Sequence, residues 1–158
     1  MQIRIAGFEQ DSIVDGTGMR FTLFTQGCPH HCPDCHNPQT HDFNGGYMCD
    51  TSEVLKIISL NPIISGVTLS GGEPFCQSSA CLEIAKEAHK RNLDVWCYTG
   101  FSFEEIKDDP LLSEVDVLVD GKFISSLKTT NSPFKGSSNQ RIIDVKASLE
   151  QGEVVLMF

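Results

Sequence analysis

The sequence GCPHHCPDCHN, residues 27–37, places three cysteines in one short loop. Cys28, Cys32 and Cys35 are separated by three and by two residues. A closed structural metal site normally takes four protein ligands, whereas a site that performs chemistry keeps one coordination position open. Three cysteines on a four-iron cluster would leave one iron free to bind a ligand from outside the protein. One interpretation of the loop is therefore a metal centre that takes part in a reaction.

A zinc site is the alternative interpretation of the same loop. Cys32 and Cys35 have ordinary zinc spacing, and nearby residues could supply the missing ligands. The candidates for these ligands are His30, His31, His36, His41 and Cys49. Taken alone, the loop leaves both an iron-sulfur centre and a non-enzymatic zinc-binding interaction module open.

A second motif, SGGEPF at residues 70–75, follows an apolar segment that we interpret as a buried strand, residues 66–69. Two glycines at the carboxyl end of a strand let the backbone approach a ligand closely, because they carry no side chain. A carboxylate beside them can hold an ammonium group. A zinc module has no use for such a motif, so the second motif favours a cofactor-binding enzyme.

Together these motifs resemble the radical S-adenosylmethionine enzymes. Their signature is a Cys-x3-Cys-x2-Cys loop after the first strand of a barrel and a Gly-Gly-Glu-Pro-like motif after the second. The resemblance implies that the three cysteines hold a 4Fe-4S cluster and that Gly71, Gly72 and Glu73 bind S-adenosylmethionine, the last two at its methionine end. The chain departs from the pattern at Asp34, where many members carry an aromatic residue that lies against the adenine.

Two further segments narrow the resemblance. SIVDGTGMR, residues 12–20, is similar to the lead-in segment of glycyl-radical activating enzymes. GSSNQRIID, residues 136–144, and the short chain are most similar to the activating proteins of anaerobic ribonucleoside-triphosphate reductase. This implies that the chain cleaves S-adenosylmethionine and generates a glycyl radical on that reductase, with electrons from a low-potential donor such as a flavodoxin or ferredoxin. The alternatives are activation of another glycyl-radical enzyme and radical chemistry on a small molecule.

Cofactor chemistry of this kind needs no catalytic side chain. We find no Ser-His-Asp grouping and no paired-carboxylate motif in the sequence, and we assign no catalytic acid, base or nucleophile. An electron-carrier ferredoxin is a poorer interpretation, because it would normally supply four cysteines to its cluster.

Segments typical of strands and helices alternate along the chain. We expect strands at residues 19–25, 66–70, 94–99, 115–119, 141–145 and 153–157, and helices from Asp50, over residues 78–91 and from Ser102. This order predicts strand-helix-strand units in which the strands are parallel and the connection is right-handed. A full eight-fold barrel needs about 250 residues, so the 158 residues predict an α/β fold with a single, incomplete parallel β/α barrel spanning residues 1–158. Such a barrel would stay open along its side and could admit a backbone loop of another protein.

The motifs fall at the carboxyl ends of predicted strands, where parallel units place their functional residues. By resemblance and position we assign four more residues to the cofactor or substrate side: Asn37, Thr99, Asp120 and Lys122. For the last three, a plain polar role at a solvent-facing strand end is an equal alternative. The run at residues 137–141 faces either the cofactor or the partner protein, and the sequence does not decide between them.

Composition sets limits on the function. The formal charge of −9 and the lack of a dense basic run argue against a nucleic-acid-binding protein. The sequence shows neither a signal pattern nor an apolar run of membrane-spanning length, so we expect a cytoplasmic protein without a membrane partner. Seven cysteines in such a protein indicate metal ligation or buried thiols rather than disulfides. We expect Cys81 and Cys97 to be buried in the core, and His30 and His31 to be exposed.

Overall fold

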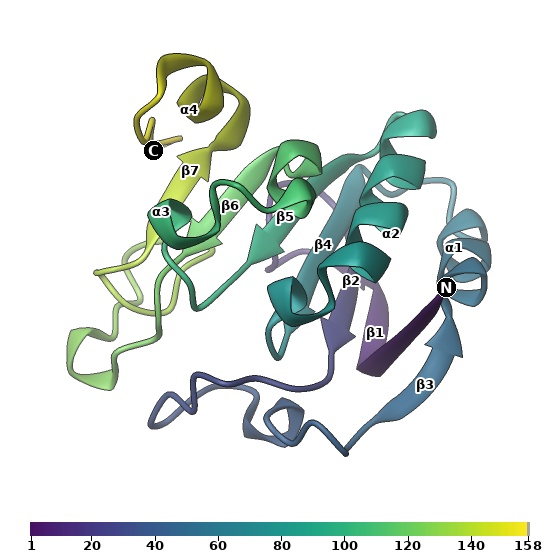
Figure 1. Ribbon diagram of the computed structural model, residues 1–158, viewed down its shortest axis with the longest axis horizontal. Helices are drawn as coiled ribbons and strands as arrows, with labels where there is room; N and C mark the ends of the chain where they lie inside the picture. The colour runs from purple at the N-terminus through teal and green to yellow at the C-terminus, as the bar shows by residue number, and fades with distance from the viewer. Residues whose placement is uncertain (158) are drawn as a thin grey trace.

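A seven-stranded sheet organises the computed structural model, which describes residues 1–157 (Figure 1). The strands lie in the order β3-β1-β2-β4-β5-β6-β7. Their bounds are β1 Gln2–Ser12, β2 Arg20–Thr25, β3 Tyr47–Asp50, β4 Gly66–Gly71, β5 Asp94–Tyr98, β6 Val117–Asp120 and β7 Arg141–Asp144. The helices are α1 Thr51–Ser59, α2 Ser78–Lys90, α3 Phe103–Ile106 and α4 Val145–Gln151, and the 3-10 turns are η1 Pro38–Thr40, η2 Pro74–Gln77, η3 Pro110–Glu114 and η4 Ser125–Leu127.

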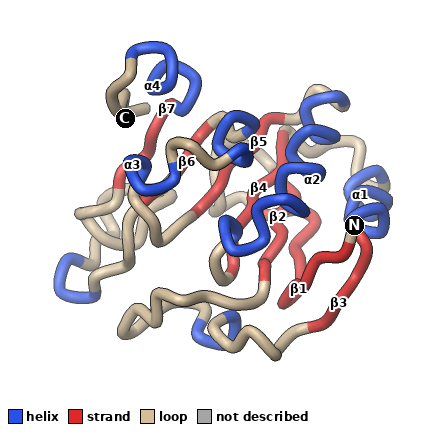
Figure 2. The backbone as a smooth tube through the Cα atoms, viewed as in Figure 1, coloured by secondary structure: helices blue, strands red, loops and turns tan. Residues whose placement is uncertain are grey.

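The four central strands are parallel, which confirms the incomplete parallel barrel predicted from the sequence. β2 pairs with β4, β4 with β5, and β5 with β6. These strands are buried along most of their length, because helices cover one of their faces and further side chains cover the other. Parallel strands end at a common edge, so the loops that follow them meet there. Figure 2 shows the long loop after β2 and the loop between β6 and β7 on the same side of the molecule.

The outer strands differ from this pattern. β1 pairs antiparallel with β2 and β3, and β7 pairs antiparallel with β6. The sequence did not lead us to expect β1 and β3, and the strand expected at residues 153–157 is wrong. That segment makes only an isolated bridge between Leu156 and Ile143. The bridge consists of two backbone hydrogen bonds, in which the Asp144 amide donates to Val155 and the Met157 amide donates to Ile142. The segment thus covers the edge of β7 without becoming a strand.

Two apolar clusters cover the two faces of the sheet. The larger cluster joins the sheet to α1 and α2 and includes Cys81 and Cys97, both 0% exposed. The smaller cluster lies on the other face and is built around Trp96, which is 1% exposed. The guanidinium of buried Arg20 lies 5.6 Å from the centre of the Trp96 ring and donates hydrogen bonds to Thr68 and Asp94. The second face is therefore also closed, except near the ends of the parallel strands.

Helix starts follow the capping residues in the sequence. The Asp50 side chain accepts a hydrogen bond from the Ser52 amide at the start of α1, and Ser102 and Glu105 form a capping box at the start of α3. The helix from Ser102 ends at Ile106, and Pro110 opens the turn η3. Within residues 1–157, none of the helices has the length and apolar character that crossing a membrane requires.

Candidate functional site

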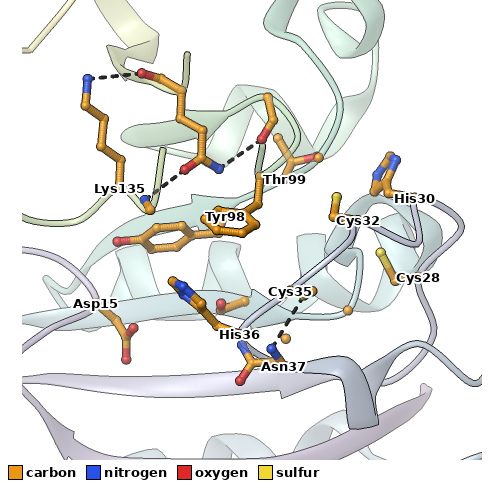
Figure 3. A pocket seen from close by; sticks show the side chains of 18 of the residues that line it. Asp15, Cys28, His30, Cys32, Cys35, His36, Asn37, Tyr98, Thr99 and Lys135 are labelled. Atoms are coloured by element: carbon orange, nitrogen blue, oxygen red, sulfur yellow. Dashed lines mark hydrogen bonds between the residues drawn. The ribbon is translucent and has the colours of Figure 1, made fainter. Parts of the chain in front are cut away.

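A cavity of about 380 Å³ lies at the edge where the parallel strands end. Its wall includes residues from the loops after β2, β4, β5 and β6, together with part of the lead-in segment and part of the loop before β7. Figure 3 shows the cysteines at one end of this cavity, Asp15 and Lys135 toward the other, and Tyr98 between them. The topology of the sheet thus brings together the motifs that the sequence carries far apart.

The cysteine loop places all three thiols on the cavity wall. Cys28, Cys32 and Cys35 line the cavity, and the sulfur of Cys35 accepts a hydrogen bond from the Asn37 amide at 3.4 Å. The loop folds back on itself, because the Cys28 amide donates to the His41 carbonyl at 3.1 Å. Within residues 1–157, no three His, Cys, Asp or Glu side chains gather closely enough to share one metal ion. A cluster does not require that arrangement, since each thiolate binds a different iron.

Cys28 is the most enclosed of the three thiols, at 8% exposed. Burial raises its pKa to about 11, against the lowering effect of the His30 backbone amide and with a smaller rise from the negative charge of Glu73. Without a metal, Cys28 is therefore a neutral thiol at physiological pH. Because iron binds the thiolate, loading the site must release the proton of Cys28.

The two glycines of the second motif let the loop after β4 pack directly on the cysteine loop. Gly71 has φ +94°, a conformation that favours glycine, and a Cβ on Gly72 would lie 2.3 Å from the Gly27 carbonyl oxygen. The Gly72 amide donates to Thr25, and the next amide, that of Glu73, donates to Gly27, both at 2.8 Å. The cysteine loop is thus fixed to the glycine motif by backbone contacts, and both glycines line the cavity.

The Glu73 carboxylate points into the protein and does not belong to the cavity wall. It is 0% exposed and accepts hydrogen bonds from the Thr99 hydroxyl and from the amides of Gly100 and Phe75. The fourth partner is His30, whose Nε2 lies 2.7 Å from Oε1 of Glu73. This side chain is 6% exposed, so our expectation that His30 is exposed was wrong. The carboxylate joins the cysteine loop to the ends of β4 and β5.

The other residues assigned from the sequence divide into two groups. Asn37 and Thr99 line the cavity. Asp120 is buried outside the cavity wall, where it accepts hydrogen bonds from the Phe103 amide and from Arg141. Lys122 is exposed and also lies outside the cavity wall. For both Asp120 and Lys122 the geometry therefore favours a plain polar role over a contact with the cofactor.

Several polar residues of the cavity wall were not assigned to the cofactor from the sequence, among them Asp15, Tyr98 and Lys135. Asp15 belongs to the lead-in segment, and its carboxylate accepts hydrogen bonds from Ser12 and Thr22. Burial, with a smaller contribution from Asp15, raises the pKa of Tyr98. Tyr98 directly precedes Thr99, so its place at the end of β5 was the available signal.

The run at residues 137–141 serves two purposes. Gln140 lines the cavity, and its side chain bonds the amides of Gly136 and Ser137 and the Gly121 carbonyl. Arg141 instead pairs with Asp120 and Glu104 at 2.6 and 2.8 Å. Gln140 therefore shapes the cavity wall, and the next residue, Arg141, fastens β7 to the rest of the protein.

Comparison with known proteins agrees with this geometry. Residues 14–143 match the protein family described as a 4Fe-4S single cluster domain. The anaerobic ribonucleoside-triphosphate reductase-activating protein of enterobacteria phage T4 is 35% identical over 82% of this chain and 86% of its own length. The activating proteins of that name from Escherichia coli K12 and Vibrio cholerae are 36% and 35% identical, over 81% and 82% of this chain and 90% of their own lengths.

The chain belongs to the family of anaerobic ribonucleoside-triphosphate reductase-activating proteins. This is a radical S-adenosylmethionine family that uses a 4Fe-4S cluster. Among solved structures, QueE from Escherichia coli has the same kind of fold, with a TM-score of 0.54 and 20% identity. The similarity covers 63% of this chain and about half, 53%, of QueE.

The residues of the cavity fit the cofactors of the activating-protein family. The donor set at one end is three thiols, the ligand type that iron-sulfur clusters use. Beside it, Gly71 and Gly72 leave the wall free of side chains, so a ligand can approach the backbone next to the cysteines. The remainder of the wall combines aromatic and polar side chains, as is usual for sites that bind small cofactors.

Proposed function

We propose that this protein generates a glycyl radical on anaerobic ribonucleoside-triphosphate reductase. The observation that carries the proposal is the shared cavity: the three-cysteine loop and the Gly71-Gly72 backbone face one space, in a chain that belongs to a family of reductase-activating proteins. When bound, the reduced cluster and S-adenosylmethionine would supply the one-electron chemistry that removes a hydrogen atom from a glycine of the reductase, with the electron coming from the donor protein.

The residues of this chain provide binding, orientation and protection from water. Cys28, Cys32 and Cys35 hold the cluster as thiolates, while Gly71 and Gly72 allow S-adenosylmethionine to lie against the backbone. Glu73 does not face the cavity, but its hydrogen bonds hold the cysteine loop in place relative to the end of β5. Of the polar residues assigned from the sequence, Asn37 and Thr99 line the cavity and can reach the cofactor directly.

The open sheet supports a protein substrate. β3 and β7 are its two edges, so the sheet does not close into a barrel. A backbone segment carrying a glycine can therefore approach the cavity from the side, which a closed barrel would prevent. The electron donor is a low-potential protein such as a flavodoxin or ferredoxin, and we place the reaction in the cytoplasm.

The experiment combines metal analysis with radical detection. Protein purified without oxygen should contain iron and sulfide, cleave S-adenosylmethionine when reduced, and give a glycyl doublet in electron paramagnetic resonance when mixed with the reductase. Zinc without sulfide would identify the interaction module instead. Cleavage of the cofactor without a glycyl doublet would point to another glycyl-radical enzyme or to a small-molecule substrate.

A further inference from the structure

The loop between β6 and β7 has a charge opposite to that of the rest of the chain. Residues 121–140 contain three lysines and none of the 21 acidic residues of the protein, although the formal net charge is −9. Lys122, Lys128 and Lys135 are therefore concentrated in a segment without compensating charge. We call residues 122–130 the basic finger. Figure 1 shows this segment as a green turn that projects beyond the end of the sheet.

The basic finger exposes apolar side chains together with its charges. Ile124 and Leu127 are 40% and 42% exposed; Ile124 directly precedes the turn η4 and Leu127 is its last residue, so both lie between Lys122 and Lys128. Both lysines are exposed, and within residues 1–157 neither forms a salt bridge. Exposed apolar side chains with a polar rim are typical of a surface that binds another protein.

Backbone hydrogen bonds connect the finger to the cavity wall. The Thr129 amide donates to the Gly136 carbonyl at 3.0 Å, and the Ser138 amide donates to the Leu127 carbonyl at 2.8 Å. In addition, the Ile124 amide donates to the hydroxyl of Ser137, which is 0% exposed. Because the segment bonded to the finger carries Lys135, Gly136 and Gln140 of the cavity wall, a partner held by the finger is positioned over the cavity.

We propose that the basic finger docks the reductase, through an acidic and partly apolar surface beside its target glycine. This inference rests on the proposed function. An acidic partner is repelled by most of this chain and attracted to the finger, which orients the two proteins during their encounter. The reductase is favoured over the electron donor because its glycine must enter the cavity, whereas a donor only needs to come near the cysteine loop.

The test uses two double variants of the cluster-loaded protein, K122E/K128E and I124S/L127S. Neither pair belongs to the cavity wall. K56E/K86E makes the same charge change at exposed lysines of α1 and α2, and L60S/I63S makes the same apolar change at side chains that are 70% and 69% exposed. Three quantities are measured: affinity for the purified reductase, glycyl radical formed with dithionite as reductant, and cofactor cleavage without the reductase.

Both finger variants should weaken reductase binding and slow radical formation about tenfold or more. The effect of K122E/K128E should shrink at high salt, because ions screen surface charges. Iron content and cofactor cleavage without the reductase should match those of the unaltered protein, and both control variants should behave like it.

Wild-type reductase affinity and radical yield in both finger variants would overturn this inference and leave the proposed function intact. A defect that appears with a flavodoxin or ferredoxin as reductant but not with dithionite would also overturn it, because the finger would then dock the electron donor. If the unaltered protein cleaves the cofactor but forms no radical on the reductase, the proposed function fails and the docking role fails with it.

Discussion

The cysteines of this protein occupy two contrasting regions. Cys28, Cys32 and Cys35 lie in a loop that faces a cavity, whereas Cys81 and Cys97 lie in a helix and a strand of the packed core. Burial raises the pKa of Cys28, and it also raises the pKa values of both core thiols. A raised pKa therefore does not separate the two groups. What separates them is the open space in front of the loop thiols, which leaves room for iron.

The two regions also differ in backbone conformation. Within the cysteine loop, His31 and Asp34 have backbone φ values of 49° and 58°, a conformation that residues other than glycine rarely adopt. Cys81 and Cys97 lie in a regular helix and a regular strand. The loop holds its conformation because hydrogen bonds attach it to η1 and to the glycine motif. The shape of the cysteine loop thus depends on contacts with other loops, whereas the core thiols lie in regular secondary structure.

The strongest test of this comparison replaces the loop cysteines one at a time. Cys28→Ala, Cys32→Ala or Cys35→Ala should abolish cofactor cleavage and leave an incomplete cluster, because each thiolate binds its own iron. Iron and sulfide analysis and the yield of 5'-deoxyadenosine measure these effects. Cys97→Ala is the matched control and should keep both cluster and cleavage. Retained cleavage in any loop variant would refute the assignment of that ligand.

The second test removes the carboxylate that joins the two loops. Glu73→Ala leaves the partners Thr99, His30 and the Gly100 amide without an acceptor, so the free energy of unfolding should fall by about 3 kcal/mol. Urea unfolding of the metal-free protein measures this. The control is Glu83→Ala, which loses one hydrogen bond to Thr51 and should cost about 1 kcal/mol.

The outcome also decides between two roles for Glu73. Loss of stability before any cofactor is added supports a carboxylate that braces the cysteine loop. Unchanged stability with weakened S-adenosylmethionine binding would instead support the direct contact with the methionine end that the sequence suggests.

The sequence predicted the part of the fold that depends on local pattern. The four parallel strands are short segments rich in aliphatic, aromatic and β-branched residues, and helices begin at capping residues such as Asp50 and Ser102, so both can be found without tertiary information. β1 and β3 were missed, and the strand at residues 153–157 was wrong, because a strand also needs a partner. Ile5 of β1 meets its partners Thr25 and Tyr47 across 20 and 42 positions of the chain, and residues 153–157 find only a short stretch of β7 to bond.

The candidate site also has a part that the sequence predicts and a part that it does not. The cysteines and glycines reach the cavity because they follow parallel strands, and strand order was predictable. The direction in which each side chain points was not predictable. Asp120 also ends a parallel strand, but it turns to Arg141, which lies opposite it on antiparallel β7. His30 turns inward to Glu73 for a similar reason, since its partner comes from a distant motif.

The third test examines a thiol of the packed core. Cys97→Ala removes one buried sulfur from a well-packed position, so the free energy of unfolding should fall by about 1 kcal/mol while cluster content stays unchanged. Urea unfolding and iron analysis of one preparation measure both quantities. Cys76→Ala, at an exposed position, should change stability by less than about 0.5 kcal/mol. A loss of iron in the Cys97 variant would show that the two regions are coupled.

The smallest expected effect concerns a titratable side chain on the helix-covered face, far from the cavity wall. Both ring nitrogens of His89 lie 2.7 Å from carboxylate oxygens, one from Glu114 and one from Asp116. Burial lowers its pKa, but the hydrogen bonds to these carboxylates outweigh burial, so the net pKa is raised above 6.5. The positive charge therefore stabilises the fold at pH values below about 6.5, and this stabilisation is lost as the pH rises through the pKa of the folded protein.

His89→Gln should consequently lower the urea midpoint of the metal-free protein at about pH 5.5 and change it little at about pH 9. Glu114→Gln removes one of the two charged partners and should lower the urea midpoint at about pH 5.5 by a smaller amount. Cys97→Ala should lower the midpoint equally at both pH values. An equal loss at both pH values for His89→Gln would mean that the ring stabilises the end of α2 by packing alone. A loss confined to acid pH would show that charge contributes to this face, where the buried thiols contribute only by packing.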